Sequence, residues 1–190
     1  MEKLFLIIEL MIKKLILLLL SFFDFFHQRK IIKFLSKKNL TKIDILFDVG
    51  AHKGESIELF LKNMNVKKII SFEPSPINFL RLKNIKDHYI KKFNKTDIII
   101  ENIGLGNENK EINFKQFEES SSSTMKSIDE KSSYFKKKFN LLNFFNKKKK
   151  YQVLKVKITT LEDYMNSNNI NKISFLKIDT EGYEYEVLKG

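Results

Sequence analysis

The chain of 190 residues contains no cysteine, which excludes a disulfide framework and thiolate ligands for a metal. This absence suits a protein that stays in the reducing cytoplasm, where we expect this one to be. Histidine is nearly absent as well: the three histidines are scattered along the chain, so the sequence predicts no metal site.

Arginine is also scarce. Of the 35 basic residues only Arg29 and Arg81 are arginines, although the formal net charge is +12. Arginine is the favoured residue for bidentate contacts to phosphates, so this positive charge does not indicate a nucleic-acid groove, and we expect no nucleic-acid partner. Lysine, isoleucine, asparagine and phenylalanine are all abundant, which fits an AT-rich coding bias.

Long uncharged segments are missing even from the apolar N-terminus. Between Met1 and Gln28 the longest uncharged run, Leu15 to Phe23, has nine residues, against the ~20 that span a bilayer. A spanning helix and a cleaved signal peptide are therefore disfavoured. On a helix with about 100° per residue, the polar residues of this segment fall within an arc of about 140°. They are Glu2, Lys3, Glu9, Lys13, Lys14, Ser21, Asp24, His27 and Gln28.

The sequence therefore predicts an amphipathic helix over residues 1–28 and a basic connecting helix to about residue 39. Two interpretations of the apolar face stay open. In one, residues 1–28 make a peripheral membrane contact at the inner face of the membrane, and the following cations attract anionic headgroups. These cations are Arg29, Lys30, Lys33, Lys37 and Lys38. In the other, the face packs on the domain or on a second subunit.

From Thr41 onward, predicted strands and helices alternate. Apolar runs predict strands over residues 43–47, 69–72, 98–103, 111–117, 153–159 and 173–178. Helical spacing of apolar residues predicts helices over residues 55–63, 76–93 and 161–165. The prolines at positions 74 and 76 mark the entry to the second helix, and Thr160 caps the third.

The segment over about residues 118–150 is rich in serine and then in lysine, and it is too long for an ordinary connection. Either it is a lid, with Ser121 to Thr124 binding a hydroxylated substrate, or it is a low-complexity insertion. The predicted organisation is a helical extension over residues 1–40 and an α/β domain over residues 41–190 that carries this insertion.

A cofactor site is indicated where the first predicted strand ends. Gly50 permits a turn with a positive φ, and Gly54 permits close approach of a ligand to the following helix. About 20 residues later the next strand ends at Glu73, where a carboxylate can accept both hydroxyls of a ribose. The glycine spacing differs from G-x-G-x-x-G, which disfavours an NAD-dependent oxidoreductase. S-adenosylmethionine fits better, because it has no phosphate and its positive charge favours carboxylates such as Asp48.

Further carboxylates follow the strand predicted over residues 173–178, namely Asp179 and Glu181. Ligands of open α/β sheets bind outside the carboxyl ends of the strands. We therefore expect Asp48, Glu73, Asp179 and Glu181 to converge on one crevice outside the strand ends.

Four blocks of the chain resemble the FkbM-type methyltransferases: Phe47–Gly54, Phe72–Pro74, Asn102–Gly106 and Phe175–Gly190. The last block is the most specific, because D-x-E-G-x-E after a strand is rarer than a glycine turn. The resemblance implies a class I methyltransferase that uses S-adenosylmethionine and has a Rossmann-like doubly wound sheet. Family members usually methylate a hydroxyl of a small molecule, sugar, glycan or secondary metabolite. They normally continue through further strands, so we expect the sheet to be truncated at its C-terminal side.

The resemblance also implies roles for individual residues. The turn at the methionine end of the cofactor would be formed by Asp48, Gly50, Ala51 and Gly54. Glu73 would hold the ribose, and Asn102 would lie near the adenine. The family's acidic pair corresponds to Asp179 and Glu181.

Methyl transfer to a hydroxyl calls for a base that removes its proton. Asp179 is the first candidate for the catalytic base, Glu181 is the alternative, and His52 is a third. For Asp179, a role in binding the cofactor or in capping a helix stays equally open. The alternative function is a non-catalytic, membrane-associated fragment that keeps the cofactor motifs and lacks the later strands.

Overall fold

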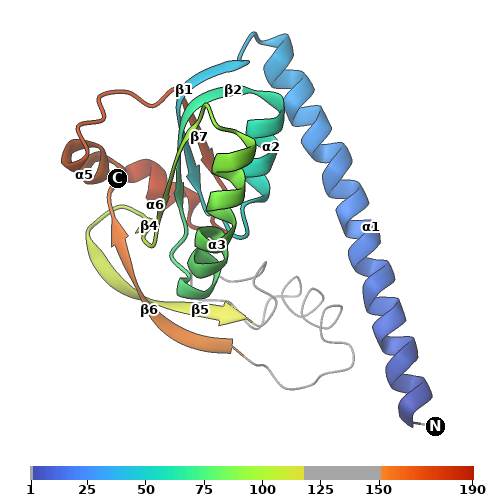
Figure 1. The fold of residues 1–190 in the computed structure, drawn as a ribbon. Helices are drawn as coiled ribbons and strands as arrows, with labels where there is room; N and C mark the ends of the chain where they lie inside the picture. Colours follow the sequence, from blue (N-terminus) through green and yellow to red (C-terminus); the bar gives the residue numbers. More distant parts are fainter. Residues whose placement is uncertain (1, 118–150) are drawn as a thin grey trace.

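The computed structural model describes residues 2–117 and 151–190 (Figure 1). At its centre four parallel strands form a sheet in the order β3-β2-β1-β7. These strands are β1 (Lys42–Val49), β2 (Asn65–Phe72), β3 (Asp97–Glu101) and β7 (Phe175–Ile178). The predicted α/β class with a parallel sheet is therefore confirmed. Because the strands are parallel, their carboxyl ends all lie at one edge of the sheet.

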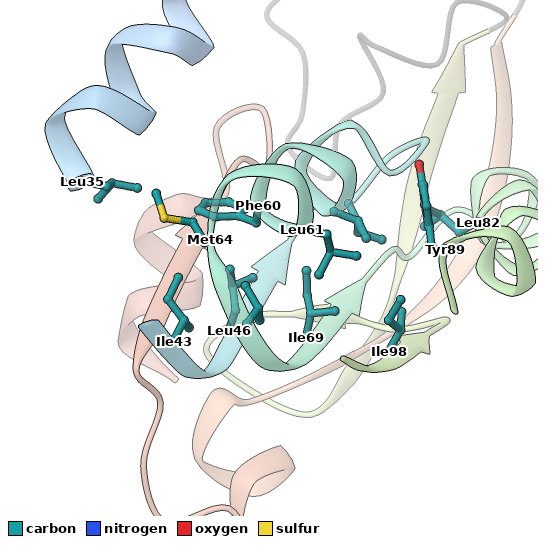
Figure 2. Close-up of a cluster of buried hydrophobic side chains, with 13 residues drawn as sticks. Leu35, Ile43, Leu46, Phe60, Leu61, Met64, Ile69, Leu82, Tyr89 and Ile98 are labelled. Atoms are coloured by element: carbon teal, nitrogen blue, oxygen red, sulfur yellow. The ribbon is translucent and has the colours of Figure 1, made fainter. Parts of the chain in front are cut away.

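Helices cover both faces of this sheet (Figure 1). One face packs against α2 (Glu55–Asn63) and α3 (Pro76–Lys92), and the other against α5 (Leu161–Ser167) and α6 (Glu184–Lys189). Consecutive strand residues point to opposite faces, so Leu46 joins the first cluster, which Figure 2 shows, and Phe47 joins the second. Burial on both faces explains why the second halves of β1 and β2 are largely apolar, whereas their more exposed first halves also carry charged residues.

A second, smaller sheet has the order β4-β6-β5. It consists of β4 (Gly104–Leu105), β5 (Lys110–Phe117) and β6 (Tyr151–Thr159), with β5 and β6 antiparallel. The strand expected over residues 111–117 as an added hairpin is thus present, and its partner is the strand expected over residues 153–159. The predicted lid or insertion over about residues 118–150, Ser121 to Thr124 included, lies outside the described residues.

The N-terminal helix differs from the prediction. Residues 2–37 form a single helix, α1 (Glu2–Lys37), instead of two, because no glycine or proline interrupts the chain in that range. Averaged over its whole length, α1 has little amphipathic character. The cations of α1 that follow residue 28, namely Arg29, Lys30, Lys33 and Lys37, lie on the side opposite to the polar arc of the first 28 residues, so the arc does not continue. Among the described helices, none combines the length and the apolar character that crossing a membrane requires.

Most of the other predicted boundaries lie close to the observed ones. The helix expected over residues 55–63 is α2 itself, and the one expected over residues 76–93 ends one residue earlier. The third strand is shorter than expected. It ends at Glu101, so Asn102 follows the strand instead of belonging to it.

Candidate functional site

The turn after β1 has the backbone conformation that its glycines predict. Gly50 has φ 81° and Gly54 has φ 90°, both in the left-handed region. The N–H groups of Gly50 and Ala51 donate to the carbonyl of Phe72 at 3.0 and 3.1 Å, which ties this turn to the end of β2. His52 also has a positive φ, 50°, a conformation that costs energy for a residue with a side chain.

The two glycines are needed for different neighbours. A Cβ at Gly50 would lie 2.0 Å from the carbonyl oxygen of Asp179, so Gly50 allows β1 and the end of β7 to meet. A Cβ at Gly54 would lie 3.0 Å from Leu82 and 3.3 Å from Ile85, both on α3. The sequence predicts that a ligand approaches Gly54 closely, whereas in the structure side chains of α3 fill the space beside this glycine.

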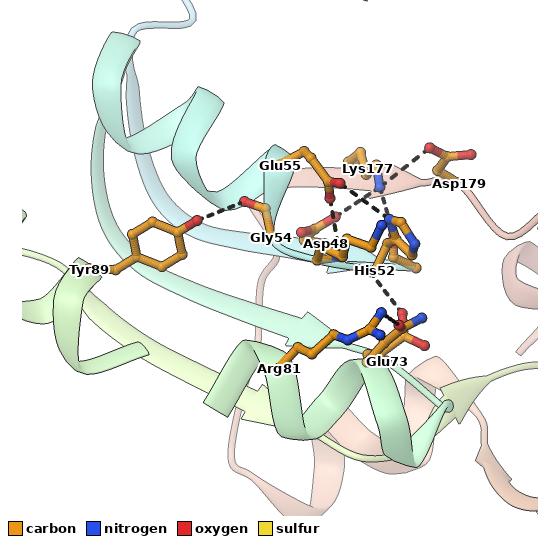
Figure 3. Close-up of polar contacts among 12 residues, drawn as sticks. Asp48, His52, Gly54, Glu55, Glu73, Arg81, Tyr89, Lys177 and Asp179 are labelled. Carbon is orange, nitrogen blue, oxygen red and sulfur yellow. Dashed lines mark hydrogen bonds and ion pairs between the residues drawn. The ribbon is translucent and has the colours of Figure 1, made fainter. Parts of the chain in front are cut away.

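Asp48 lies beneath the turn, fully buried, in an ion pair with Lys177 of the adjacent strand β7. The Lys177 Nζ atom is 3.0 Å from Asp48 Oδ1, and it donates to the carbonyl of Gly50 at 3.0 Å (Figure 3). Burial raises the pKa of Asp48, and the charge of Lys177 opposes this shift. Asp48 thus supports the turn from below, and its carboxylate does not reach the surface.

Glu73 joins the ends of β1 and β2. It is 5% exposed, and its Oε2 accepts from the N–H of His52 at 2.8 Å while its Oε1 accepts from the N–H of Ser75 at 3.0 Å. Burial raises the pKa of Glu73, and these two backbone hydrogen bonds oppose the shift. The carboxylate predicted to contact a ribose thus lies at the end of β2. It stabilises the turn after β1 through His52 and the turn after β2 through Ser75.

Asn102 lies next to this carboxylate. Its Nδ2 donates to the carbonyl of Glu73 at 2.9 Å and to that of Pro74 at 3.2 Å. The side chain thus fastens the turn after β2 to the end of β3. This contact joins two of the segments that the sequence singled out, Asn102–Gly106 and Phe72–Pro74.

The two acidic residues after β7 are exposed, unlike Asp48 and Glu73. Asp179 is anchored by its N–H, which donates to the carbonyl of Val49 at 2.9 Å, while its side chain is 69% exposed. Its Oδ2 lies 3.7 Å from Lys177 Nζ. Glu181 has φ 53° and precedes Gly182 with φ 102°. Glu184 Oε1 orders this loop by accepting from the N–H groups of Thr180 and Gly182, both at 3.1 Å.

Asp48, Glu73, Asp179 and Glu181 thus all lie at or shortly after the carboxyl ends of β1, β2 and β7. They do not all face one crevice, because Asp48 is fully buried beneath the turn while Asp179 and Glu181 are exposed. His52 also lies shortly after the end of β1, with its Nδ1 3.3 Å from Glu55 Oε1. Within residues 2–117 and 151–190, no group of three or more His, Asp or Glu side chains is arranged to hold a metal ion.

Sequence reasoning missed Lys177 and Glu101. Lys177 was visible as the one charged residue inside the apolar strand β7, a position that needs a partner when the strand is buried. Glu101 is the last residue of β3, and its Oε1 accepts from the Tyr164 hydroxyl at 2.9 Å. Burial, followed by this hydrogen bond, raises the pKa of Tyr164, which therefore stays protonated as a donor.

Three comparisons with known proteins bear on this site. A family model described as the methyltransferase FkbM domain matches residues 48–190, from Asp48 to the last residue. Among solved structures, a crystal structure of methyltransferase FkbM from Methylobacillus flagellatus KT is similar, with 17% identity and a TM-score of 0.46. The alignment covers 77% of this chain and 28% of that one, so this chain spans less than a third of its length. The search of curated proteins finds no match.

Proposed function

The chain belongs to the FkbM methyltransferase family, and from this premise we propose that it transfers a methyl group from S-adenosylmethionine to a hydroxyl of a sugar, glycan or secondary metabolite. The match that supports the proposal runs through the glycine turn and every predicted carboxylate of the site. The comparisons do not favour the alternative of a non-catalytic fragment.

The difference in exposure among the four carboxylates carries the proposal. Asp48 and Glu73 are buried and tie strands and turns together, whereas Asp179 and Glu181 are open to solvent at the same edge. A hydroxylated acceptor that arrives from solvent can meet the second pair and cannot meet Asp48. The buried pair therefore shapes the site, and the exposed pair is available for the acceptor.

The residues at this edge fit S-adenosylmethionine. Glu73 accepts two backbone N–H groups and a side-chain hydrogen bond from Asn78. A carboxylate offers about four lone pairs, so this one can still accept a ribose hydroxyl. Glu73 would hold the ribose, Asn102 would lie near the adenine, and the turn from Gly50 to Gly54 would hold the methionine end. When bound, the cofactor supplies a methyl group activated by a positive sulfur, which leaves as a neutral thioether once the acceptor oxygen has taken the methyl group.

The protein's own contribution is orientation and removal of one proton. Asp179 takes the hydroxyl proton of the acceptor as the new carbon–oxygen bond forms, and Glu181 is the second candidate for this role. Lys177 lies between Asp48 and Asp179, so it restrains the base relative to the turn that holds the cofactor.

Calorimetric titration of the chain with S-adenosylmethionine, its demethylated product and NAD tests the proposal. We expect binding of the first two and none of NAD. Glu73→Gln should weaken binding of S-adenosylmethionine by about 10- to 100-fold, the usual effect of leaving buried polar partners unpaired. The matched variant Glu58→Gln, which changes a half-exposed carboxylate on α2, should leave it unchanged. Binding of NAD without any response to S-adenosylmethionine would refute the proposal.

A further inference from the structure

The helix α1 projects from the domain along most of its length (Figure 1). Within the described residues, its members that join a hydrophobic core cluster are Ile32 and Leu35, both near its carboxyl end. Figure 2 shows Leu35 near Met64. The side of α1 that carries these two residues is therefore its docking side.

A stripe of exposed apolar side chains runs along another side of α1. It consists of Ile7, Met11, Ile12, Leu15 and Leu18, each between 42% and 66% exposed. With about 100° per residue, these five positions lie within an arc of about 140°. Around the helix axis the centre of this arc lies about 90° from Ile32 and about 150° from Leu35. Docking of the helix on the domain therefore leaves the five stripe residues exposed.

Exposed lysines continue the stripe along the same line of the helix. Lys30 follows Ile12, and Lys33 follows Leu15, by a separation that corresponds to about five complete turns. Lys37 lies one turn beyond Lys33 and is exposed as well. One side of the helix is thus apolar toward its N-terminus and cationic toward its C-terminus, where it meets the domain.

We propose that α1 binds the surface of an anionic membrane. The apolar stripe lies at the boundary between headgroups and acyl chains, and Lys30, Lys33 and Lys37 lie against the lipid phosphates. Apolar side chains and cations on one side of a helix are complementary to such a surface, which offers both a hydrocarbon boundary and negative charge. The domain is then held at the membrane by a helix that docks on it through a different side, the one that carries Ile32 and Leu35.

A second copy of the chain fits this stripe less well. In a parallel pair the lysines of both helices would face one another, which is unfavourable for like charges. In an antiparallel pair they would lie beside the apolar part of the partner, where a lysine finds no counter-charge. The position of the charges therefore favours lipid over self-association.

Flotation of the intact chain with vesicles tests this proposal. We expect it to float with phosphatidylcholine vesicles that contain phosphatidylglycerol, and to float much less with phosphatidylcholine alone or at high salt, which shortens the range of the attraction.

The triple variant Lys30→Gln/Lys33→Gln/Lys37→Gln should weaken binding by about 100-fold, because each lysine near an anionic surface contributes about fivefold. The triple variant Met11→Gln/Leu15→Gln/Leu18→Gln should weaken binding to the same vesicles by about 10-fold or more.

Matched variants on α3 and in the turn that follows it control for charge and for apolar area. Lys83→Gln/Lys91→Gln/Lys95→Gln removes three other exposed lysines, and Ile77→Gln/Leu80→Gln/Ile90→Gln removes three other exposed apolar side chains. Both should float like the unchanged chain, with unaltered circular dichroism throughout.

Three results would overturn the proposal. They are equal losses in the α1 variants and in the control variants, resistance to carbonate extraction that indicates a spanning helix, and a stripe-dependent dimer in sedimentation that does not float.

Discussion

At the scale of single residues, exposure separates two kinds of acid at the strand ends. Asp48 and Glu73 are buried among backbone groups and Lys177, whereas the side chain of Asp179 is largely exposed. An acid that stabilises a turn and an acid that removes a proton should respond differently to substitution. The two residue-scale predictions depend on this difference.

Asp179→Asn should lower the rate of methyl transfer far more than it weakens binding of S-adenosylmethionine, because a base acts in the transition state. We expect a loss of about 10² to 10⁴-fold in kcat, the usual contribution of a general base. Steady-state kinetics and calorimetry on the same protein separate the two effects. Asp87→Asn, at an exposed position of α3, serves as the control. Similar losses in rate and in binding would assign Asp179 to the cofactor instead.

Lys177→Met should destabilise the fold by about 3 kcal/mol or more at neutral pH, since it leaves the Asp48 carboxylate buried without its counter-charge. Burial already raises the pKa of Asp48, so the folded state binds this proton more tightly than the unfolded state does. The stabilisation by that proton is present at low pH and is lost as pH rises through the folded pKa.

Lys177→Met also lacks the positive charge that opposes the raised pKa of Asp48. Its loss in the free energy of unfolding, relative to the unchanged chain, should therefore be largest at neutral pH. It should shrink as pH falls and Asp48 becomes protonated. Urea denaturation across pH measures this. The control Lys62→Met breaks an exposed pair with Glu58 and should cost under about 1 kcal/mol. A loss in Lys177→Met as small as the loss in Lys62→Met would mean that another group compensates the charge of Asp48.

At the scale of elements, the site depends on how closely β1, β7 and α3 approach one another. Gly50 lies against the backbone of Asp179, and Gly54 lies against the ends of flexible side chains on α3. A backbone atom can yield only if a whole strand moves, whereas a side chain can rotate. The two glycines should therefore tolerate substitution unequally, although both have a positive φ.

Gly54→Ala should cost about 1 to 3 kcal/mol in the free energy of unfolding, the range for a strained backbone conformation. Gly50→Ala should cost more, because the new Cβ would also force β1 and the end of β7 apart. Chemical denaturation of both variants makes the comparison. If Gly50→Ala proved the milder of the two, close contact with Asp179 would not be what requires glycine there.

At the scale of the whole molecule, α1 and the domain are joined through a small contact near Leu35. Stability of the domain should therefore depend on the last turns of α1 and not on its first 28 residues. Membrane binding, by contrast, should require the entire helix.

A chain that begins at residue 29 should keep the free energy of unfolding of the intact protein within about 0.5 kcal/mol. A chain that begins at residue 41 should lose about 1.5 to 3 kcal/mol, the value of one buried leucine. Leu35→Ala in the intact chain should reproduce most of that loss. Thermal and urea denaturation of the three proteins decide the matter, and a large loss on removing residues 2–28 would contradict it.

The sequence by itself determined the elements around the site and the acids at their ends. Apolar runs that stop at Asp48, Glu73 and Asp179 mark strand ends through residues only a few positions apart. Helix α2 begins after Gly54 and ends where the periodic pattern ends, which is again local information. Such signals depend on neighbouring residues, so one sequence suffices to find them.

Only the tertiary structure decided what each acid does. Lys177 lies about 130 residues from Asp48 along the chain, and their pairing exists because β7 adds beside β1 in parallel register. In the same way the crowding of Gly54 by α3, the contact of Asn102 with Glu73 and Pro74, and the bond from Tyr164 to Glu101 join separate elements. Burial is set by which elements flank a strand end, and no local pattern contains that arrangement. The sequence therefore placed four carboxylates at one edge, and packing divided them into two that hold the turns and two that face solvent.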